Sequence, residues 1–151
     1  MLTPEGTILM MKFSEPNTGK EFWVTPGGAV GAGEELKSAL HRELREETGR
    51  EGLSIGPEIW VREYSCVWNN SSVTQRERYF LIECEEFEPK MLHDPESGET
   101  QALLAFRWWT TKQILESDEQ FGPPEIAELV GSLIEDGTPV VPMDLGSYSG
   151  P

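Results

Sequence analysis

The amino-acid sequence predicts an α/β fold in which a mixed β-sheet is packed between helices, an α/β/α sandwich. Segments with strand character occur before, between and after segments with helical periodicity, an order that is typical of this class. The 151 residues suit one domain with a single hydrophobic core. Since no internal repeat or second domain is evident, we assign residues 1–137 to the domain and residues 138–151 to an irregular tail.

The first half of the chain is predicted to place a Gly-rich loop between a strand and a helix. Apolar segments at residues 7–13 and 21–25 are typical of strands. Pro26-Gly27-Gly28 then ends the second strand and begins a loop whose glycines allow the backbone to approach a ligand closely. A helix is predicted over Glu35–Thr48, because its acidic start suits the helix dipole and Gly49 suits a left-handed cap.

The second half is predicted to add a long hairpin, a further strand and two helices. The expected elements are hairpin strands at 55–68 and 73–84, a strand at 103–109, a short helix capped by Thr110 or Thr111 that ends at Leu115, and an amphipathic helix between Pro124 and Gly137. The polar stretch at 85–99 is expected to be a loop.

One fixed spacing of residues spans the Gly-rich loop and the first helix. Gly28 is followed after five residues by Glu34, and after seven more by the run Arg42-Glu43-Leu44-Arg45-Glu46-Glu47-Thr48-Gly49. Read alone, this run could be an ordinary charged helix with surface ion pairs at i,i+3 and i,i+4. The positions of its glutamates around the helix argue against that interpretation.

The glutamates are predicted to lie on the buried side of the helix. At about 100° per residue, Leu36, Leu40 and Leu44 form an apolar stripe, with Glu43 and Glu47 within it or at its edge. Glu46 lies on its flank, and the opposite face is expected to hold Lys37, Ser38, His41, Arg45 and Thr48. Carboxylates on a buried face need compensation, and a divalent cation such as Mg²⁺ with oxygen ligands provides it.

The same residues resemble the signature box of the Nudix hydrolases, which cleave a nucleoside diphosphate linked to another group. The resemblance covers residues 27–49 closely and the element order of the whole chain, and it implies a Nudix-like α/β/α sandwich. Arg50 stands where the family box usually ends in an aliphatic residue. Only Met1 and Leu2 precede the first turn, where members tend to have a full strand. Either the start is shortened or the sheet is completed another way, for example by a partner chain.

The resemblance implies metal-assisted hydrolysis of a pyrophosphate bond by water. Bound metal ions bridge phosphate oxygens and lower the pKa of the attacking water. The implied ligands of one or more Mg²⁺ or Mn²⁺ ions are Glu43, Glu46, Glu47 and the carbonyl of Gly27. Arg42 is expected to pair with a carboxylate such as Glu34 and fix the ligand side chains. Gly28 belongs to the loop expected to cradle the substrate phosphates.

The general base and the substrate contacts are less strongly encoded. We choose Glu99 as the base over Glu96 and Glu77, because Nudix enzymes often recruit a glutamate from a loop in this part of the chain. Such a loop can complete the site when substrate binds. Arg76 and Arg78 share one face of the second hairpin strand, where they contact a phosphate or remain solvated. The five tryptophans offer stacking surfaces for a base, and no marker downstream of the box names the leaving group.

Composition and charge restrict the partners. The formal net charge of −15 argues against non-specific nucleic-acid binding. No apolar run approaches the roughly 20 residues of a membrane span, and no signal peptide is evident. No Cys/His cluster or Ser-His-Asp pattern suggests itself, which leaves carboxylate and metal chemistry. We expect a small-molecule nucleotide as the substrate, no membrane, and a monomer or homodimer.

The two cysteines, Cys66 and Cys84, are too few for a disulfide framework. A hairpin turning at residues 69–72 would place Cys66 opposite about position 75, out of register with Cys84. We therefore expect two small buried hydrophobic residues in a reducing compartment, by default the cytoplasm.

Two functions from different classes remain open. The first is the hydrolase, with nucleotide sugars, ADP-ribose-like compounds and (deoxy)nucleoside triphosphates as candidate substrates. The alternative is a Nudix-fold module that senses a nucleotide without cleaving it. Such modules commonly lose the box carboxylates, so the retention of Glu43, Glu46 and Glu47 favours the enzyme.

Overall fold

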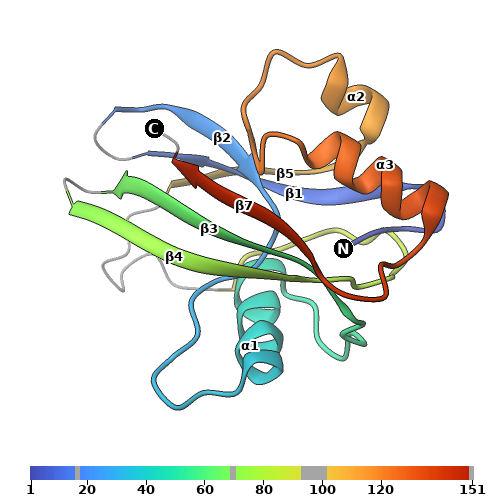
Figure 1. The fold of residues 1–151 in the computed structure, drawn as a ribbon, viewed down its shortest axis with the longest axis horizontal. Coiled ribbons are helices and arrows are strands. Elements are labelled where there is room, and N and C mark those ends of the chain that lie inside the picture. The colour runs from blue at the N-terminus through green and yellow to red at the C-terminus, as the bar shows by residue number, and fades with distance from the viewer. Residues whose placement is uncertain (16–17, 69–70, 93–101, 150–151) are drawn as a thin grey trace.

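The computed structural model describes residues 1–15, 18–68, 71–92 and 102–149, and these residues form two β-sheets and three helices (Figure 1). The first sheet has the strand order β5-β1-β2-β6. Its strands are β1 (Thr7–Ser14), β2 (Glu21–Val24), β5 (Ala102–Thr110) and β6 (Phe121–Gly122). Strand β1 is antiparallel to β2 and β5, whereas β2 and β6 are parallel.

The second sheet has the order β4-β3-β7. Its strands are β3 (Glu58–Trp68), β4 (Ser71–Phe80) and β7 (Met143–Ser149). Strands β3 and β4 form the predicted hairpin, and β7 runs parallel to β3. The predicted α/β class is confirmed, with the mixed sheet divided into two sheets that each contain one parallel pair.

The helices lie on two sides of the sheets. Helix α1 (Leu36–Thr48) is on the opposite side of the molecule from α2 (Thr111–Leu115) and α3 (Ile126–Asp136) (Figure 1). Thr110, rather than Thr111, caps α2: its hydroxyl accepts from the amide of Gln113, whose side chain accepts from the amide of Thr110. This reciprocal arrangement is a capping box, which satisfies two backbone donors at once.

The main hydrophobic core joins residues of both sheets to α2 and α3. Strand β1 is buried along most of its length, and Leu9, Met10 and Met11 have no exposed surface, as expected for a central strand covered on both faces. The buried members of the main core cluster include Ile8, Met10, Trp23, Trp60, Trp109, Ile126 and Val130.

Two expectations about the strands were wrong. The tail was expected to be irregular, but residues 143–149 form β7 beside β3. The hairpin places Cys66 opposite Val73 rather than position 75, because the two strands pair as far as Trp68 and Ser71. Cys84 is a free, half-buried thiol, and burial raises its pKa.

The N-terminal residues are attached to the sheets by backbone hydrogen bonds. Leu2 forms isolated bridges to Ile8 and Glu83. Its amide donates to the carbonyl of Ile82 at 2.9 Å. In the three-stranded sheet, β7 from the C-terminal part of the chain pairs with β3. Among the described residues, every helix is too short or too polar to span a lipid bilayer.

Candidate active site

Helix α1 carries most of the predicted site residues, and local signals define its ends. The side chain of Glu35 accepts from the amide of Ser38 and caps the N-terminus, so the helix begins one residue later than expected. Gly49 has φ 72° and closes the C-terminus with a bond from its amide to the carbonyl of Arg45. This left-handed conformation favours glycine. The predicted helix is thus confirmed to within one residue.

The buried face of α1 is rotated slightly from the predicted leucine stripe. Its buried residues are Ala39, Leu44 and Thr48, whereas Leu36 and Leu40 are half-buried. The prediction of Thr48 on the solvent face was wrong: it is 1% exposed. Its hydroxyl donates to the carbonyl of Leu44 at 2.6 Å, which removes the cost of burying it.

The Gly-rich loop meets the glutamates of α1 directly. The amide of Gly27 donates to Oε2 of Glu47 at 2.8 Å. A Cβ atom on Gly28 would overlap the carboxylate of Glu43. Glycine is therefore required at position 28 for the loop and this carboxylate to approach so closely.

Arg42 joins four acceptors around the carboxylates. It forms a bidentate pair with Glu34, with Nε to Oε1 at 2.9 Å and Nη2 to Oε2 at 3.0 Å. Nη1 donates to Oε1 of Glu43 at 2.7 Å and lies 3.4 Å from Oε2 of Glu46. Nη2 also donates to the carbonyl of Ala29 at 3.0 Å. The structure contains the expected pair with Glu34, and the same guanidinium orients two further glutamates.

The carboxylates of the site differ strongly in pKa. Hydrogen bonds from Arg42, followed by one from the amide of Gly31, lower the pKa of Glu34 to about 2. Burial raises the pKa of Glu47 to about 8, and the charges of Glu43 and Glu46 add to this against the amide of Gly27. Glu34 is therefore a fixed anion at neutral pH, whereas Glu47 in the metal-free protein is largely protonated.

The donor set fits a hard divalent cation. Glu43, Glu46 and Glu47 offer only oxygen atoms, which Mg²⁺ and similar ions prefer. The mutual repulsion that raises the pKa of Glu47 is the kind of interaction that a cation relieves. Among the described residues no three Asp, Glu, His or Cys side chains already converge as a metal site, because Glu43 and Glu46 face Arg42 and Glu47 faces Gly27.

In the described part of the chain, the other predicted site residues make no contact with the cluster formed by the Gly-rich loop and α1. Arg78 forms a bidentate pair with Glu58, and Arg76 is exposed. Glu99 and Glu96 lie outside the described residues. Glu77 accepts hydrogen bonds from Arg62, Tyr79 and Gln75. The sequence analysis did not single out Arg62. The period of two along β3 was the available signal, because it places Arg62 on the same face as Trp60 and Tyr64.

The segment after β4 fastens to the C-terminal end of α1. The amides of Lys90 and Leu92 donate to the carbonyls of Thr48 and Glu46 at 3.0 and 2.7 Å. The guanidinium of Arg50 lies 5.3 Å from the ring centre of Phe87, a cation–π distance. Arg50 thus contacts this segment in place of the aliphatic residue usual at the end of the box.

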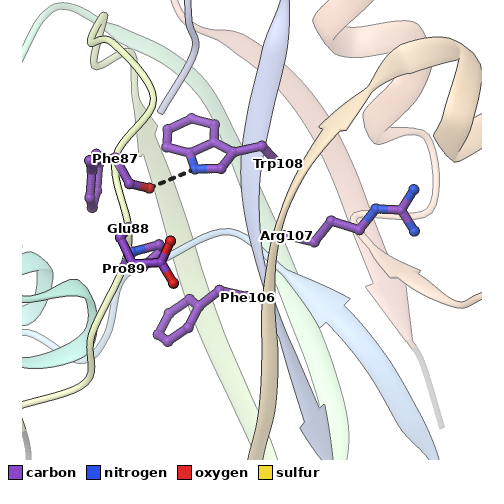
Figure 2. Close-up of a pocket in the computed structure, with 6 residues that line it drawn as sticks. All are labelled: Phe87, Glu88, Pro89, Phe106, Arg107 and Trp108. Carbon is purple, nitrogen blue, oxygen red and sulfur yellow. Dashed lines mark hydrogen bonds between the residues drawn. The ribbon is translucent and has the colours of Figure 1, made fainter.

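A cavity of about 340 Å³ lies between the same segment and β5. Figure 2 shows Phe106 and Trp108 projecting toward residues 87–89, with Arg107 on the other side of the strand. Nε1 of Trp108 donates to the carbonyl of Phe87 at 3.1 Å. None of the predicted site residues lines this cavity, so it is distinct from the carboxylate cluster.

The geometry agrees with a comparison to known families, in which the NUDIX domain model matches residues 1–130. The chain belongs to the Nudix family. Phosphatase NudJ from Escherichia coli K12 is a Nudix relative that is 32% identical over 120 residues, covering 79% of this chain and 70% of that protein.

Solved structures of Nudix proteins share the fold. The MutT protein from Methanosarcina mazei Go1 has a TM-score of 0.52 and 20% identity, covering 89% of this chain and 88% of that chain. The Ap4A hydrolase from C. elegans has a TM-score of 0.53 and 18% identity, covering 86% of each chain. This Nudix chain is a pyrophosphohydrolase that acts on nucleoside diphosphate derivatives, and enzymes of the family generally use divalent metal ions.

Replacing Gly28 by alanine is expected to lower kcat about tenfold or more, because the new Cβ displaces the carboxylate of Glu43. The backbone of Gly28 is not left-handed, and the glutamate side chain can move, so the melting temperature should change little. Steady-state kinetics and thermal unfolding of Gly28→Ala measure both effects. Gly131→Ala is the control, because a Cβ there meets nothing within 4 Å; equal activity of the two variants would contradict the contact.

Replacing Arg42 by lysine is expected to lower kcat/KM at least about tenfold, because lysine keeps the charge but lacks the planar fork that orients Glu34, Glu43 and Glu46. The matched control is Arg45→Lys on the exposed face of the same helix, where Arg45 lies 3.8 Å from Glu51. Kinetics at saturating metal compare the two variants. Wild-type activity in Arg42→Lys would mean that the glutamates need no orientation by the guanidinium.

Proposed function

We propose that the chain hydrolyses the pyrophosphate bond of its substrate at the cluster formed by the Gly-rich loop and α1, with Mg²⁺ or Mn²⁺ as the metal. The observation that carries this proposal is the set of contacts that joins Gly27 to Glu47, Gly28 to Glu43, and Arg42 to Glu43 and Glu46. It gathers three carboxylates, one guanidinium and a glycine turn at one end of a buried helix face.

Each group of the cluster has a distinct task in this proposal. Glu43, Glu46 and Glu47 hold the metal, with the carbonyl of Gly27 as a further ligand. The bound ion polarises phosphate oxygens and lowers the pKa of the attacking water. Arg42 keeps the glutamates in place through its bond to Glu34, whose low pKa maintains the ion pair across the whole working pH range.

The substrate contacts and the base complete the proposal. Gly28 lets the loop backbone lie directly against the carboxylate of Glu43, and in this proposal the backbone of the same loop contacts the substrate phosphates. Arg76 is exposed on β4 and open to a phosphate, whereas Arg78 must exchange Glu58 for the substrate. Glu99 takes the proton of the attacking water, a role for which Glu77 is less suited because three donors already hold its carboxylate.

The proposed setting is the cytoplasm, with the enzyme acting as a monomer or a homodimer. The acidic composition, with a formal charge of −15, keeps such a protein soluble. An acidic protein repels an anionic substrate, so binding requires the local positive charge of Arg42 and of the metal.

A substrate panel with metal and chelator arms tests the proposed function. The panel contains nucleoside di- and triphosphates, because the E. coli relative is named a phosphatase. Nucleotide sugars, ADP-ribose and a dinucleoside polyphosphate complete it. We expect release of phosphate or a mononucleotide from at least one compound with Mg²⁺ or Mn²⁺, loss of that activity in excess chelator, and recovery when the ion is restored. Full activity in chelator would refute the metal-dependent mechanism.

A further inference from the structure

The C-terminal strand β7 brings an aromatic ring to the face of the second sheet. It lies beyond residues 1–130 that match the family model, and Figure 1 shows it running alongside β3. The parallel register places Tyr148 directly opposite Tyr64. The two rings are stacked, with centres 5.8 Å apart and planes inclined by 9°. Tyr148 is 37% exposed, so the stack ends in a ring that solvent and ligands can reach.

Beside this pair lies a buried arginine with an unused donor. Arg62 is 6% exposed, and its Nε donates to Oε2 of Glu77 at 2.5 Å. Within the described part of the chain, its Nη1 is buried without a hydrogen-bond partner. The guanidinium carbon lies 5.1 Å from the ring centre of Tyr64 and 5.7 Å from that of Tyr148. The guanidinium of Arg62 therefore lies beside both rings, at a similar distance from each.

An unpaired N–H group in such a place points to an acceptor that arrives with a ligand. A ring face attracts the charge of a guanidinium, but it does not replace an in-plane acceptor for each N–H group. Leaving a buried donor unsatisfied costs free energy, and native structures contain few such groups. Glu77 fixes the orientation of Arg62, and it also accepts from the hydroxyl of Tyr79 at 2.6 Å. The free donor is thus held in one direction rather than left to rotate.

We propose that Arg62, Tyr64 and Tyr148 form the subsite that holds the nucleobase of the substrate, with β7 as the strand that completes it. The proposal rests on the proposed function, which supplies a nucleotide as the substrate. A flat base extends the stack on the exposed ring of Tyr148. Its carbonyl oxygen or ring nitrogen accepts from Nη1 of Arg62, the kind of contact by which arginine distinguishes base edges.

Binding of nucleoside 5′-monophosphates tests the subsite separately from hydrolysis. Isothermal titration of AMP, GMP, CMP and UMP in excess chelator removes the metal and offers no pyrophosphate bond. We expect wild-type protein to bind at least one of the four. Tyr148→Ala should weaken the tightest of them by about tenfold or more, whereas Tyr148→Phe keeps the ring and should stay within about twofold. Val140→Ala, at a fully exposed residue just before β7, is the control for general effects.

Base discrimination tests the role of Arg62. Arg62→Lys keeps a positive charge but cannot donate in the same geometry. We expect the ratio between the tightest and weakest of the four monophosphates to fall toward one, an effect that a purely structural role would not produce. If Arg62→Lys does not fold, the two Tyr148 variants still decide the proposal.

Two results would overturn the subsite. One is a wild-type protein that binds none of the four monophosphates, and the other is a Tyr148→Ala variant whose affinity stays within about twofold. Either result leaves metal-dependent hydrolysis at the α1 cluster untouched. Conversely, tight binding of a monophosphate by a protein that cleaves nothing in the substrate panel would refute the proposed function and leave the subsite standing.

Discussion

Replacing Glu47 by glutamine is expected to lower kcat by at least about 10²-fold, the scale for removing a charge-stabilising group from a transition state. Burial is the largest cause of the raised pKa of Glu47, so its charge is poorly compensated by solvent. Glutamine preserves the shape and can still contact the amide of Gly27 through its carbonyl, so the loss is one of charge. Glu46→Gln is expected to behave in the same way.

Stability should move in the opposite direction. The pKa of Glu47 is about 8 in the folded metal-free protein and 4.5 as the ordinary value. Between these values the folded state binds a proton that the unfolded state has released. In chelator, the free energy of unfolding should therefore fall as pH rises from about 5 to about 8, by at most about 1.4 kcal/mol per pH unit. Glu47→Gln removes this dependence, and its melting temperature at pH 8 should equal or exceed that of wild type.

Kinetics at saturating Mg²⁺ and thermal unfolding in chelator at several pH values measure these two effects. Glu51→Gln is the matched control, because Glu51 is an exposed carboxylate just beyond the same helix and should change neither quantity. A folded Glu46→Gln/Glu47→Gln double variant with unchanged turnover would remove both residues from the metal site. An unchanged pH dependence of the melting temperature in Glu47→Gln would mean that another group titrates.

The candidate site could be proposed from the sequence because its signals are local. The spacing from Gly28 to Gly49 fixes a glycine turn, a helix start and a left-handed cap within one continuous segment. Helical periodicity then places Glu43 and Glu47 toward the buried side without any tertiary information. The contact of Gly27 with Glu47 follows from the way that this loop folds back along the helix.

The features that were missed depend on distant parts of the chain. The segment of β7 contains Asp144 and Gly146 and follows two prolines, so its own propensity for a strand is weak. It is a strand because β3 offers it a free edge to pair with. Arg62 carries a charge, and sequence reasoning places charges at the surface. Among the described residues, Glu77 on β4 and the rings of three tyrosines compensate the burial of Arg62.

Replacing Glu99 by glutamine is the second variant for which we expect a kcat loss of roughly 10²-fold or more, with little change in substrate affinity. Glu99 lies three residues before the start of β5, in a segment whose preceding residue Leu92 is hydrogen-bonded to the carbonyl of Glu46. We expect a carboxylate in this loop to complete the site when substrate binds and to take the proton of the attacking water.

The competing bases are less free to act. The carboxylate of Glu77 accepts hydrogen bonds from three donors. Among the box glutamates, Glu43 and Glu47 are engaged by Arg42 and Gly27, and in the proposed mechanism they also bind the metal. The measurement is kcat across pH at saturating substrate and Mg²⁺ for Glu99→Gln, with Glu96→Gln from the same polar stretch as the control, expected within about threefold of wild type. A loss under about threefold in Glu99→Gln would exclude Glu99. It would transfer the role of general base to Glu77 or to one of the box glutamates.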